Sequence, residues 1–401
     1  MATSGPLDGI EVLELGSAVA GPFAGRLLAD HGANVIRIEP LWGSTYRNRP
    51  LEYDTHGADS LVYRFMSYNT SKDSIALDLK SEGGADILRG LIDEADVLLE
   101  NMRPGVMDRL GFGWDAVHER NPGLIYCAVT GFGDEEPYAS WPAHDTSVLA
   151  ITGMADQVGE LERPERMDVF AIDHATAMYA TIGILMALVE RGVSGEGQLI
   201  EVAMYDVALS WFGHQFGEYS GAQADPDIEA VYGGHFAPNE MVEVADGYLA
   251  FFVPPEAWDE FCAVVDREDW ADPDHRYGTV GKRVRNRIQL REDLEDLLAD
   301  RTAEAWVDHF ADRLPEAILA PATRWEDVPD HPLTEKREMA LTREQDDIGE
   351  YTIPGRALKF SRTPGSTGDV PHLGEDTDEI LKALGYSADA VEDLRERDVV
   401  R

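Results

Sequence analysis

Short apolar segments and amphipathic segments alternate along the first 130 residues. Residues 9–16 (GIEVLELG) read as a strand, residues 23–32 (FAGRLLADHG) as a helix, and residues 33–40 (ANVIRIEP) as the next strand. Further strands are predicted at 73–79, 96–101 and 124–133, with a helix over 83–95. Strands joined through helices give a mostly parallel sheet with helices on both faces. We therefore predict an α/β fold whose ligands bind beyond the carboxyl ends of the strands.

The length of 401 residues and a change of pattern after residue 212 predict two domains, because a single core stops growing beyond about 250–300 residues. Residues 1–212 form the N-terminal part of the large domain, and 213–229, rich in Gly, Gln and Asp, form a linker. Residues 230–320 carry their own strands and helices and form a smaller domain. A return linker over 321–345 leads to 346–401, which we expect to complete the large domain.

The charge balance excludes one class of partner. The chain has 76 acidic and 34 basic residues, a formal charge of −42, so it lacks the basic face that nucleic acid requires. The acidic residues are spread over every surface-like segment, which fits a halophile's cytoplasm, where 1 M salt screens charges within about 3 Å. The N-terminus lacks a basic signal region, and we find no apolar run of about 18 residues clear of charge. We expect a cytoplasmic protein with no membrane partner.

Two cysteines, Cys127 and Cys262, are too few and too far apart for a disulfide framework or a metal site. We expect buried free thiols and no bound metal. The loop 15–22 (LGSAVAGP) stands where a dinucleotide fold binds phosphate, but its spacing is not G-x-G-x-x-G. A dinucleotide site, a plain tight connection and a site for another nucleotide-bearing ligand all remain open. Lys80, Arg103 and Arg109 follow predicted strands, where they could pair with surface acids or bind a polyanion.

Asp173 stands at the head of an apolar helix predicted over 174–191. Asp is a favoured N-cap residue, so capping alone could explain this position. A catalytic carboxylate would also be kept ionised there by the positive end of the helix. His144 and Asp145 (PAHDTS) form a second polar pair, which could be structural or catalytic.

Several blocks of the chain, in order, resemble the family III CoA-transferases, a group that also contains the α-methylacyl-CoA racemases. The matching blocks are 7–39, 72–84 (KDSIALDLKSEGG), 100–113 (ENMRPGVMDRLGFG), 191–209 (RGVSGEGQLIEVAMYDVAL), 245–253 and 354–386. With the acidic composition, the resemblance points to a haloarchaeal member near the branch that handles mesaconyl-CoA. It implies a Rossmann-like large domain built from both chain ends, a small inserted α+β domain, and an interlocked-ring homodimer.

The resemblance also implies roles for individual residues. Asp173 matches the nucleophile of the transferases, and Gly233 and Gly234 match a glycine-rich lid. The implied CoA contacts are Ala18, Val19, Ala20, Leu77, Lys80, Asn101, Met102, Arg103 and Arg109. Pro40 replaces an arginine of the family, and Arg37 is the substitute that we predict for it. No tightly bound cofactor is implied, because CoA enters as a thioester substrate.

The implied reaction moves CoA from an acyl-CoA donor to a carboxylic acid through an Asp173 anhydride and an aspartyl-CoA thioester. We predict succinyl-CoA as donor and mesaconate or a similar C4–C5 dicarboxylate as acceptor, with Arg47, Arg49 and His144 meeting the second carboxylate. One alternative is a racemase that uses His144 and Asp173 as its acid/base pair. Another is a CoA-binding protein without catalysis.

Overall fold

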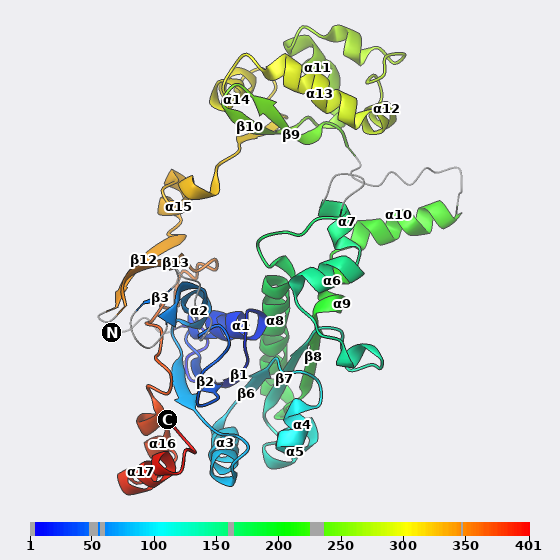
Figure 1. Ribbon diagram of the computed structural model, residues 1–401. Helices are drawn as coiled ribbons and strands as arrows, with labels where there is room; N and C mark the ends of the chain where they lie inside the picture. Colours follow the sequence, from blue (N-terminus) through cyan, green and yellow to red (C-terminus); the bar gives the residue numbers. More distant parts are fainter. Residues whose placement is uncertain (1–4, 48–54, 57–60, 159–163, 225–235, 346–347) are drawn as a thin grey trace. The chain divides into compact units, whose positions relative to one another are not determined.

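The structure is a computed structural model that describes residues 5–47, 55–56, 61–158, 164–224, 236–345 and 348–401. The chain divides into two compact units (Figure 1). The first unit contains Met1–Gly213 and Lys336–Arg401, and the second contains His214–Glu335. The first unit is therefore built from two separate stretches of chain. The return to it falls inside the segment predicted as a return linker.

A six-stranded sheet forms the centre of the first unit, with the order β5-β2-β1-β6-β7-β8. The strands are β1 (Glu11–Leu15), β2 (Asn34–Glu39), β5 (Asp73–Ala76), β6 (Val97–Glu100), β7 (Ile125–Thr130) and β8 (Leu199–Ala203). Every neighbouring pair is parallel, so the prediction of an α/β fold with a parallel sheet is confirmed. The strand order reverses between β1 and β6, where connections leave the sheet in opposite directions and open a crevice for ligands.

Alternating side chains of the strands build two apolar layers. Leu13 and Leu15 pack with helices α3 (Glu82–Glu94), α5 (Trp114–Arg120), α16 (Thr377–Ala383) and α17 (Ala388–Glu396). Val12 points to the opposite face and packs with α1 (Ala20–Ala29) and α8 (Ala171–Ser194). Parallel sheets need cover on both faces. The C-terminal helices thus cover a sheet whose strands come from the first 203 residues.

The last residues return to the edge strand β5. Leu77 pairs with Val400 in an antiparallel bridge, and the Arg401 N–H donates to the Ala76 carbonyl at 3.3 Å. Asp376 Oδ2 accepts the Ser74 N–H at 2.7 Å. These bonds use backbone groups that an open edge would leave exposed.

The remaining elements of the first unit form smaller layers around the sheet. They are β3 (Thr55–His56), β4 (Leu61–Val62), α2 (Tyr63–Asn69), α4 (Val106–Leu110), η1 (Tyr138–Ser140), α6 (Asp145–Ile151), α7 (Met154–Val158), α9 (Met204–Ser210), β12 (Ala340–Gln345) and β13 (Gly349–Pro354). Phe65 and Met66 of α2 pack on the β12–β13 hairpin. The start of α8 packs with α6, α7 and α9, so α6 and α8 meet beside the sheet.

The second unit has a three-stranded antiparallel sheet of order β11-β10-β9. Its elements are β9 (Asn239–Val244), β10 (Gly247–Phe252), η2 (Pro255–Ala257), α11 (Trp258–Val264), η3 (Glu268–Ala271), α12 (Val280–Arg285), α13 (Arg287–Leu298), α14 (Ala303–Ala311), β11 (Ile318–Pro321), η4 (Trp325–Asp327) and α15 (Pro332–Lys336), which ends at its border. Trp258, Phe261, Trp270 and Phe310 are buried in its core. The segment predicted as a linker begins with a helix, α10 (Gly213–Ala224), because Gln215, Ala222 and other helix formers outweigh its glycines.

Helix α8 is the one helix in the described residues that is long and apolar enough to cross a bilayer, by length and composition alone. It packs on α1, β7 and β8, and 39% of its most apolar window is buried. A core helix of an α/β protein has the same composition, so this feature is weak evidence for a membrane span. Both cysteines, Cys127 and Cys262, are free and buried, which confirms the prediction.

Candidate active site

A cavity of about 620 Å³ lies at the carboxyl ends of β1, β2, β6 and β7. This is within the size range of small-molecule sites, about 300–1,000 Å³. It coincides with the reversal of strand order, where the α/β prediction expects a ligand. The structure brings several predicted site residues together in its lining, namely Ala18, Ala20, Asn101, Met102, Arg103, His144 and Asp173.

The loop after β1 is tied to the end of β6. The Ser17 N–H donates to Asn101 Oδ1 at 2.9 Å, and Asn101 Nδ2 donates to the Ser17 carbonyl at 2.9 Å. Gly16 lies so close to Asn101 that a Cβ on it would meet Oδ1 at 2.7 Å. Ala18 adopts a left-handed backbone, with φ 63°, which a non-glycine residue keeps only where its surroundings fix it. The loop therefore presents Ala18 and Ala20 to the cavity in a fixed conformation.

Asp173 belongs to the first turn of α8. The helix begins at Ala171, and the cap position is taken by Phe170, which has a left-handed backbone and no side-chain cap bond. The prediction that Asp173 caps a helix starting at 174 is therefore wrong. The carboxylate of Asp173 instead faces the cavity, where the Ala20 N–H contacts it.

The cap of α8 comes from another helix. Asp145, at the start of α6, accepts the Ile172 N–H at 2.8 Å and the Asp173 N–H at 3.3 Å, both through Oδ2. Helix starts carry N–H groups without intrahelical partners, and Asp is among the best acceptors for them. Asp145 is only 2% exposed. A residue 28 positions earlier thus replaces the local cap that Phe170 cannot supply.

The surroundings of Asp173 favour its neutral form. Burial and, as a smaller cause, the charge of Asp145 together raise the pKa of Asp173 to about 7, against the hydrogen bond from the Ala20 N–H, which lowers it. The sequence predicts that the helix end keeps this carboxylate ionised. The structure corrects that prediction, because desolvation outweighs the favourable end of the helix. Near pH 7 the group is present in both protonation states.

His144 forms a capping box at the start of α6. Its ring Nδ1 accepts the backbone N–H of Ser147 at 3.3 Å, and the backbone N–H of His144 donates to Ser147 Oγ at 3.0 Å. Because Nδ1 accepts, the neutral ring carries its proton on Nε2. The side chain is exposed and lines the cavity, so His144 combines a structural role with a place in the site.

Four predicted CoA contacts lie outside the lining of this cavity. Val19 and Leu77 are 1% and 2% exposed and pack in the core of the first unit. Lys80 and Arg109 are exposed at the surface. Their roles in CoA binding stay predictions.

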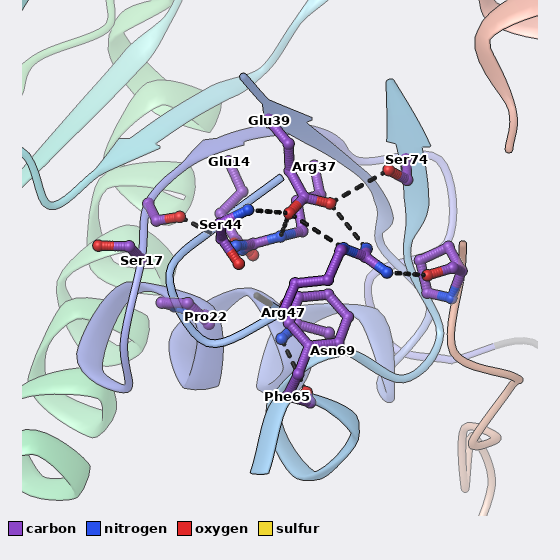
Figure 2. Close-up of polar contacts among 12 residues, drawn as sticks. Glu14, Ser17, Pro22, Arg37, Glu39, Ser44, Arg47, Phe65, Asn69 and Ser74 are labelled. Atoms are coloured by element: carbon purple, nitrogen blue, oxygen red, sulfur yellow. Dashed lines mark hydrogen bonds and ion pairs between the residues drawn. The ribbon is translucent and has the colours of Figure 1, made fainter. Parts of the chain in front are cut away.

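Arg37, predicted to substitute for the family arginine that Pro40 replaces, is buried among protein groups (Figure 2). Its guanidinium pairs with Glu14 and lies 3.5 Å from Glu39, and Nη2 donates to the Gly16 carbonyl at 3.0 Å. The side chain is 1% exposed. The structure therefore uses Arg37 to fix the loop after β1, with its charge neutralised by acids of the same sheet.

Arg47, predicted to meet a substrate carboxylate, is also surrounded by protein (Figure 2). Nη2 donates to Glu39 Oε1 at 2.7 Å, Nη1 donates to the Pro371 carbonyl at 3.0 Å, and the guanidinium lies 3.9 Å from the Phe65 ring centre. These groups take up its charge and planar face, and Arg47 is 1% exposed and is not among the residues that line the cavity. Sequence shows a cation at this position but not its buried partner.

Lys72 completes the buried ion network, which we define as Glu14, Arg37, Glu39, Arg47 and Lys72. Its Nζ lies 2.6 Å from Glu14 Oε2 and donates to the Pro22 carbonyl, at the start of α1, at 2.8 Å. Burial lowers the pKa of Lys72 to about 8, an effect that Glu14 opposes. The network thus holds both ends of the loop between β1 and α1.

Some residues of the site carry little sequence signal. Tyr46 lines the cavity, and the guanidinium of the exposed Arg64 lies 5.7 Å from its ring centre. Neither position has a pattern that marks it, because each lies in an irregular segment or a short helix. The predicted residues Arg49, Gly233 and Gly234 lie outside the described residues.

Comparison with known proteins places the chain in a family. The model of CoA-transferase family III matches residues 7–377. Succinyl-CoA:mesaconate CoA-transferase of Haloarcula hispanica is 31% identical over 389 residues, covering 95% of this chain and 97% of that protein. Probable fatty acyl-CoA transferase Rv3272 of Mycobacterium tuberculosis is 33% identical, covering 92% and 96%. Formyl-CoA:oxalate CoA-transferase of Escherichia coli O157:H7 is 27% identical, covering 99% and 100%.

Solved structures agree with this placement. The orthorhombic form of Rv3272 superposes with a TM-score of 0.80 at 29% identity, covering 94% of this chain and 99% of that one. A CAIB/BAIF family protein from Brucella suis gives 0.79 at 28% identity, covering 95% and 100%. The match extends over both units, so it is not confined to the Rossmann-like sheet. The chain belongs to CoA-transferase family III and is an enzyme of the transferase class.

Proposed function

We propose that this enzyme moves CoA from an acyl-CoA donor to a free carboxylic acid through covalent intermediates on Asp173. One observation carries the proposal: a carboxylate with a raised pKa lines the cavity at the strand-order reversal, beside the loop 16–20. Perturbed carboxylates in such a crevice are strong candidates for catalytic groups.

The chemistry needs a carrier that preserves the energy of the thioester. The Asp173 carboxylate attacks the thioester carbonyl of the donor. The C–S bond breaks, CoA leaves as a thiolate, and a mixed anhydride of Asp173 and the acyl group remains. The thiolate then attacks the Asp173 carbonyl and releases the donor acid, which leaves an aspartyl-CoA thioester. The acceptor carboxylate repeats both steps in reverse. No oxidation or net proton change is required.

Each tetrahedral step places negative charge on an oxygen. The Ala20 N–H, which contacts the Asp173 carboxylate, is suited to donate to that oxygen when Asp173 is acylated. The anhydride must also be kept from water. Gly233 and Gly234 are the predicted lid for this purpose.

For the acceptor we propose a C4–C5 dicarboxylate such as mesaconate, with succinyl-CoA as donor. The names of the two Haloarcula relatives support this choice. Because Arg47 is bound to Glu39, the second carboxylate needs another cation. Arg64, beside Tyr46 at the cavity, is the residue that we assign to it, together with the Nε2–H of His144.

A second substrate class has its own support. Phe132, Trp141, Phe170 and Met204 give part of the cavity an apolar lining, and the relative Rv3272 is named for fatty acyl transfer. An apolar monocarboxylate would bury its chain against these side chains. Substituting Arg64→Gln distinguishes the classes. It should raise the KM for mesaconate at least tenfold and leave the KM for butyrate within twofold, and equal effects would remove the dicarboxylate assignment.

Peptide mass spectrometry tests the nucleophile directly. The enzyme is incubated in high KCl with succinyl-CoA, then with butyryl-CoA, and hydroxylamine traps any activated carboxyl group. A hydroxamate confined to Asp173 is the expected result. An unmodified Asp173, combined with exchange of the α-proton of a 2-methylacyl-CoA in deuterated water, would identify a racemase instead.

We also propose that the enzyme works as an interlocked homodimer in the cytoplasm. The solvent-facing side of α8 exposes Met178, Ile182, Leu185, Met186, Val189 and Val193, a spacing that forms one apolar face. An apolar face of this kind marks a protein interface. Light scattering should give twice the chain mass of 44.3 kDa. Two differently tagged dimers should exchange no chains without denaturant, and ready exchange would contradict the interlocked arrangement.

A further inference from the structure

Asp145 has one oxygen engaged and one without a partner. Oδ2 binds the N–H groups of Ile172 and Asp173. Oδ1 is buried and has no hydrogen-bond partner among the residues that the structure describes, although the residue lines the cavity. A buried carboxylate oxygen without a partner is costly, and a neutral Ser or Asn would satisfy the same two N–H groups. The site therefore keeps a negative charge that capping does not require.

Within the described part of the chain, this charge has no paired cation. Among the residues that the structure describes, no ion pair joins Asp145 or Asp173 to a Lys, Arg or His side chain. The Asp145 carboxylate accepts the backbone N–H of Asp173 at 3.3 Å, and its charge raises the pKa of the Asp173 side chain. A like charge at such a distance disfavours the ionised form of its neighbour.

The other ionisable groups around Asp173 do not compensate for it. Tyr46 and Tyr68 of the facing loop and α2 have raised pKa values and stay neutral. His144 caps α6 as an acceptor, and His174 bonds the Phe170 carbonyl at 2.9 Å. Two cations act on these tyrosines: the exposed Arg64, whose effect water screens, and Arg26, which acts on Tyr68 and is paired with Asp30.

We propose that Asp145 is a positioning residue that holds the first turn of α8 and uses its fixed charge to favour the acylated forms of Asp173 over the free carboxylate. This inference rests on the proposed transferase function. When Asp173 attacks the thioester, its negative charge leaves with the CoA sulfur, and the anhydride that remains on Asp173 is uncharged. The aspartyl-CoA thioester is uncharged as well. Repulsion from Asp145 is therefore present before the reaction and relieved in both intermediates.

The test compares Asp145→Asn and Asp145→Glu with a matched control. Asn retains an oxygen for the two N–H groups and removes the charge, whereas Glu retains the charge. Asp168→Asn is the control, because Asp168 lies five residues before Asp173 and its side chain is 81% exposed. The readouts are kcat and KM for the acyl-CoA donor, the pH profile of kcat/KM, and the single-turnover rate of Asp173 acylation.

For Asp145→Asn we expect the acid limb of kcat/KM to move about one pH unit lower and acylation at high pH to slow about three- to tenfold, because one pKa unit is a tenfold change in equilibrium. KM should stay within about twofold of wild type. Asp145→Glu should keep the wild-type pH profile, and Asp168→Asn should match wild type throughout. An Asp145→Asn enzyme with the same pH profile and acylation rate as Asp168→Asn would overturn the proposal.

A second measurement needs no acyl donor. Water-soluble carbodiimide activates protonated carboxyl groups, so Asp173 should be labelled near pH 7 in wild type and several-fold less in Asp145→Asn. Equal labelling in the two proteins would also overturn the proposal. If wild type forms no adduct with any acyl-CoA but the labelling difference is present, the transferase mechanism fails and the electrostatic coupling stands.

Discussion

Two carboxyl groups of the first unit are both shielded from water, yet their pKa values are shifted in opposite directions. Burial alone would raise the pKa of both Glu39 and Asp173. Arg37, Arg47 and the Ser44 N–H reverse the effect at Glu39 and lower its pKa to about 2. Asp173 has Asp145 as its neighbour, and its pKa is raised to about 7. Burial makes the pKa shift large, and the sign of the neighbouring charge decides whether the pKa rises or falls.

The difference follows the tasks of the two regions. The buried ion network holds the loop after β1 through Gly16 and Pro22, which requires charges that stay paired. The cavity keeps a carboxylate, Asp173, which in the proposed mechanism loses its charge by forming a covalent bond. The same unit therefore neutralises charge where it needs a rigid loop and leaves charge unpaired where it needs a reactive group.

The largest expected effect comes from removing the unpaired carboxylate. Asp173→Asn should lower transferase activity by at least about a thousandfold, because in the proposed mechanism Asp173 carries the acyl intermediate. Its melting temperature should equal or exceed that of wild type above pH 7, since a disfavoured charge is removed. Activity above one tenth of the Asp168→Asn control would show that Asp173 is not the nucleophile.

Removing a paired carboxylate should act on stability. Glu39→Gln leaves the buried guanidinium group of Arg47 without its carboxylate partner and removes one of the two carboxylates beside Arg37, so it should lower the free energy of unfolding by about 3–4 kcal/mol. Urea unfolding in high KCl measures this change in the free energy of unfolding. The control is Glu350→Gln, because Glu350 is exposed. A loss equal to that of the control would mean that the network does not support the fold.

The pH dependence of this loss has a definite sign. The folded pKa of Glu39 lies below its usual value of 4.5, so its stabilisation is fully present above pH 4.5. The difference between wild type and Glu39→Gln should shrink as the pH falls from 4.5 towards 2. A difference that stays constant over this range would contradict the ion pairing.

The reactive carboxylate should give a third, smaller effect in the wild-type enzyme. The proposed mechanism requires ionised Asp173, whose pKa is about 7. We expect kcat/KM to rise through neutral pH and to fall about tenfold for each pH unit below about 7. Stopped assays between pH 5 and 9 at fixed KCl measure this limb, and a midpoint near 4 would show that the cavity does not raise the pKa of Asp173.

The smallest effect is expected for a pair on the surface. Arg397 Nη1 lies 2.9 Å from Asp393 Oδ2, and both side chains are about 60% exposed. Arg397→Ala should change the free energy of unfolding by at most about 0.5 kcal/mol. A loss comparable to that of Glu39→Gln would mean that exposure does not separate the two kinds of ion pair.

Sequence predicts the sheet because its signals are local: apolar runs such as 9–16 mark the strands, and the intervening helices make them parallel. The apolar pattern also locates α8, although it starts the helix at 174 and the structure starts it at Ala171, and the family resemblance is what marks Asp173 as a site residue. Sequence misses the cap that Asp145 supplies, since that bond joins residues 28 positions apart. For Arg37 and Arg47 the missing information is the partner. Glu14, a charged residue inside an apolar strand, is the sequence signal that could have indicated a buried ion network.

The return of residues 399–401 to strand β5 has a consequence for synthesis on the ribosome. The backbone groups that bond to Ala76 and Asp78 belong to residues 399–401, which are translated more than 300 residues later. The hydrogen bonds at this edge of the sheet can therefore form only after residues 399–401 have been made. The second unit, 214–335, is complete much earlier. Domains fold as their residues emerge, so the unit in the middle of the chain can reach its final structure before the unit that begins it.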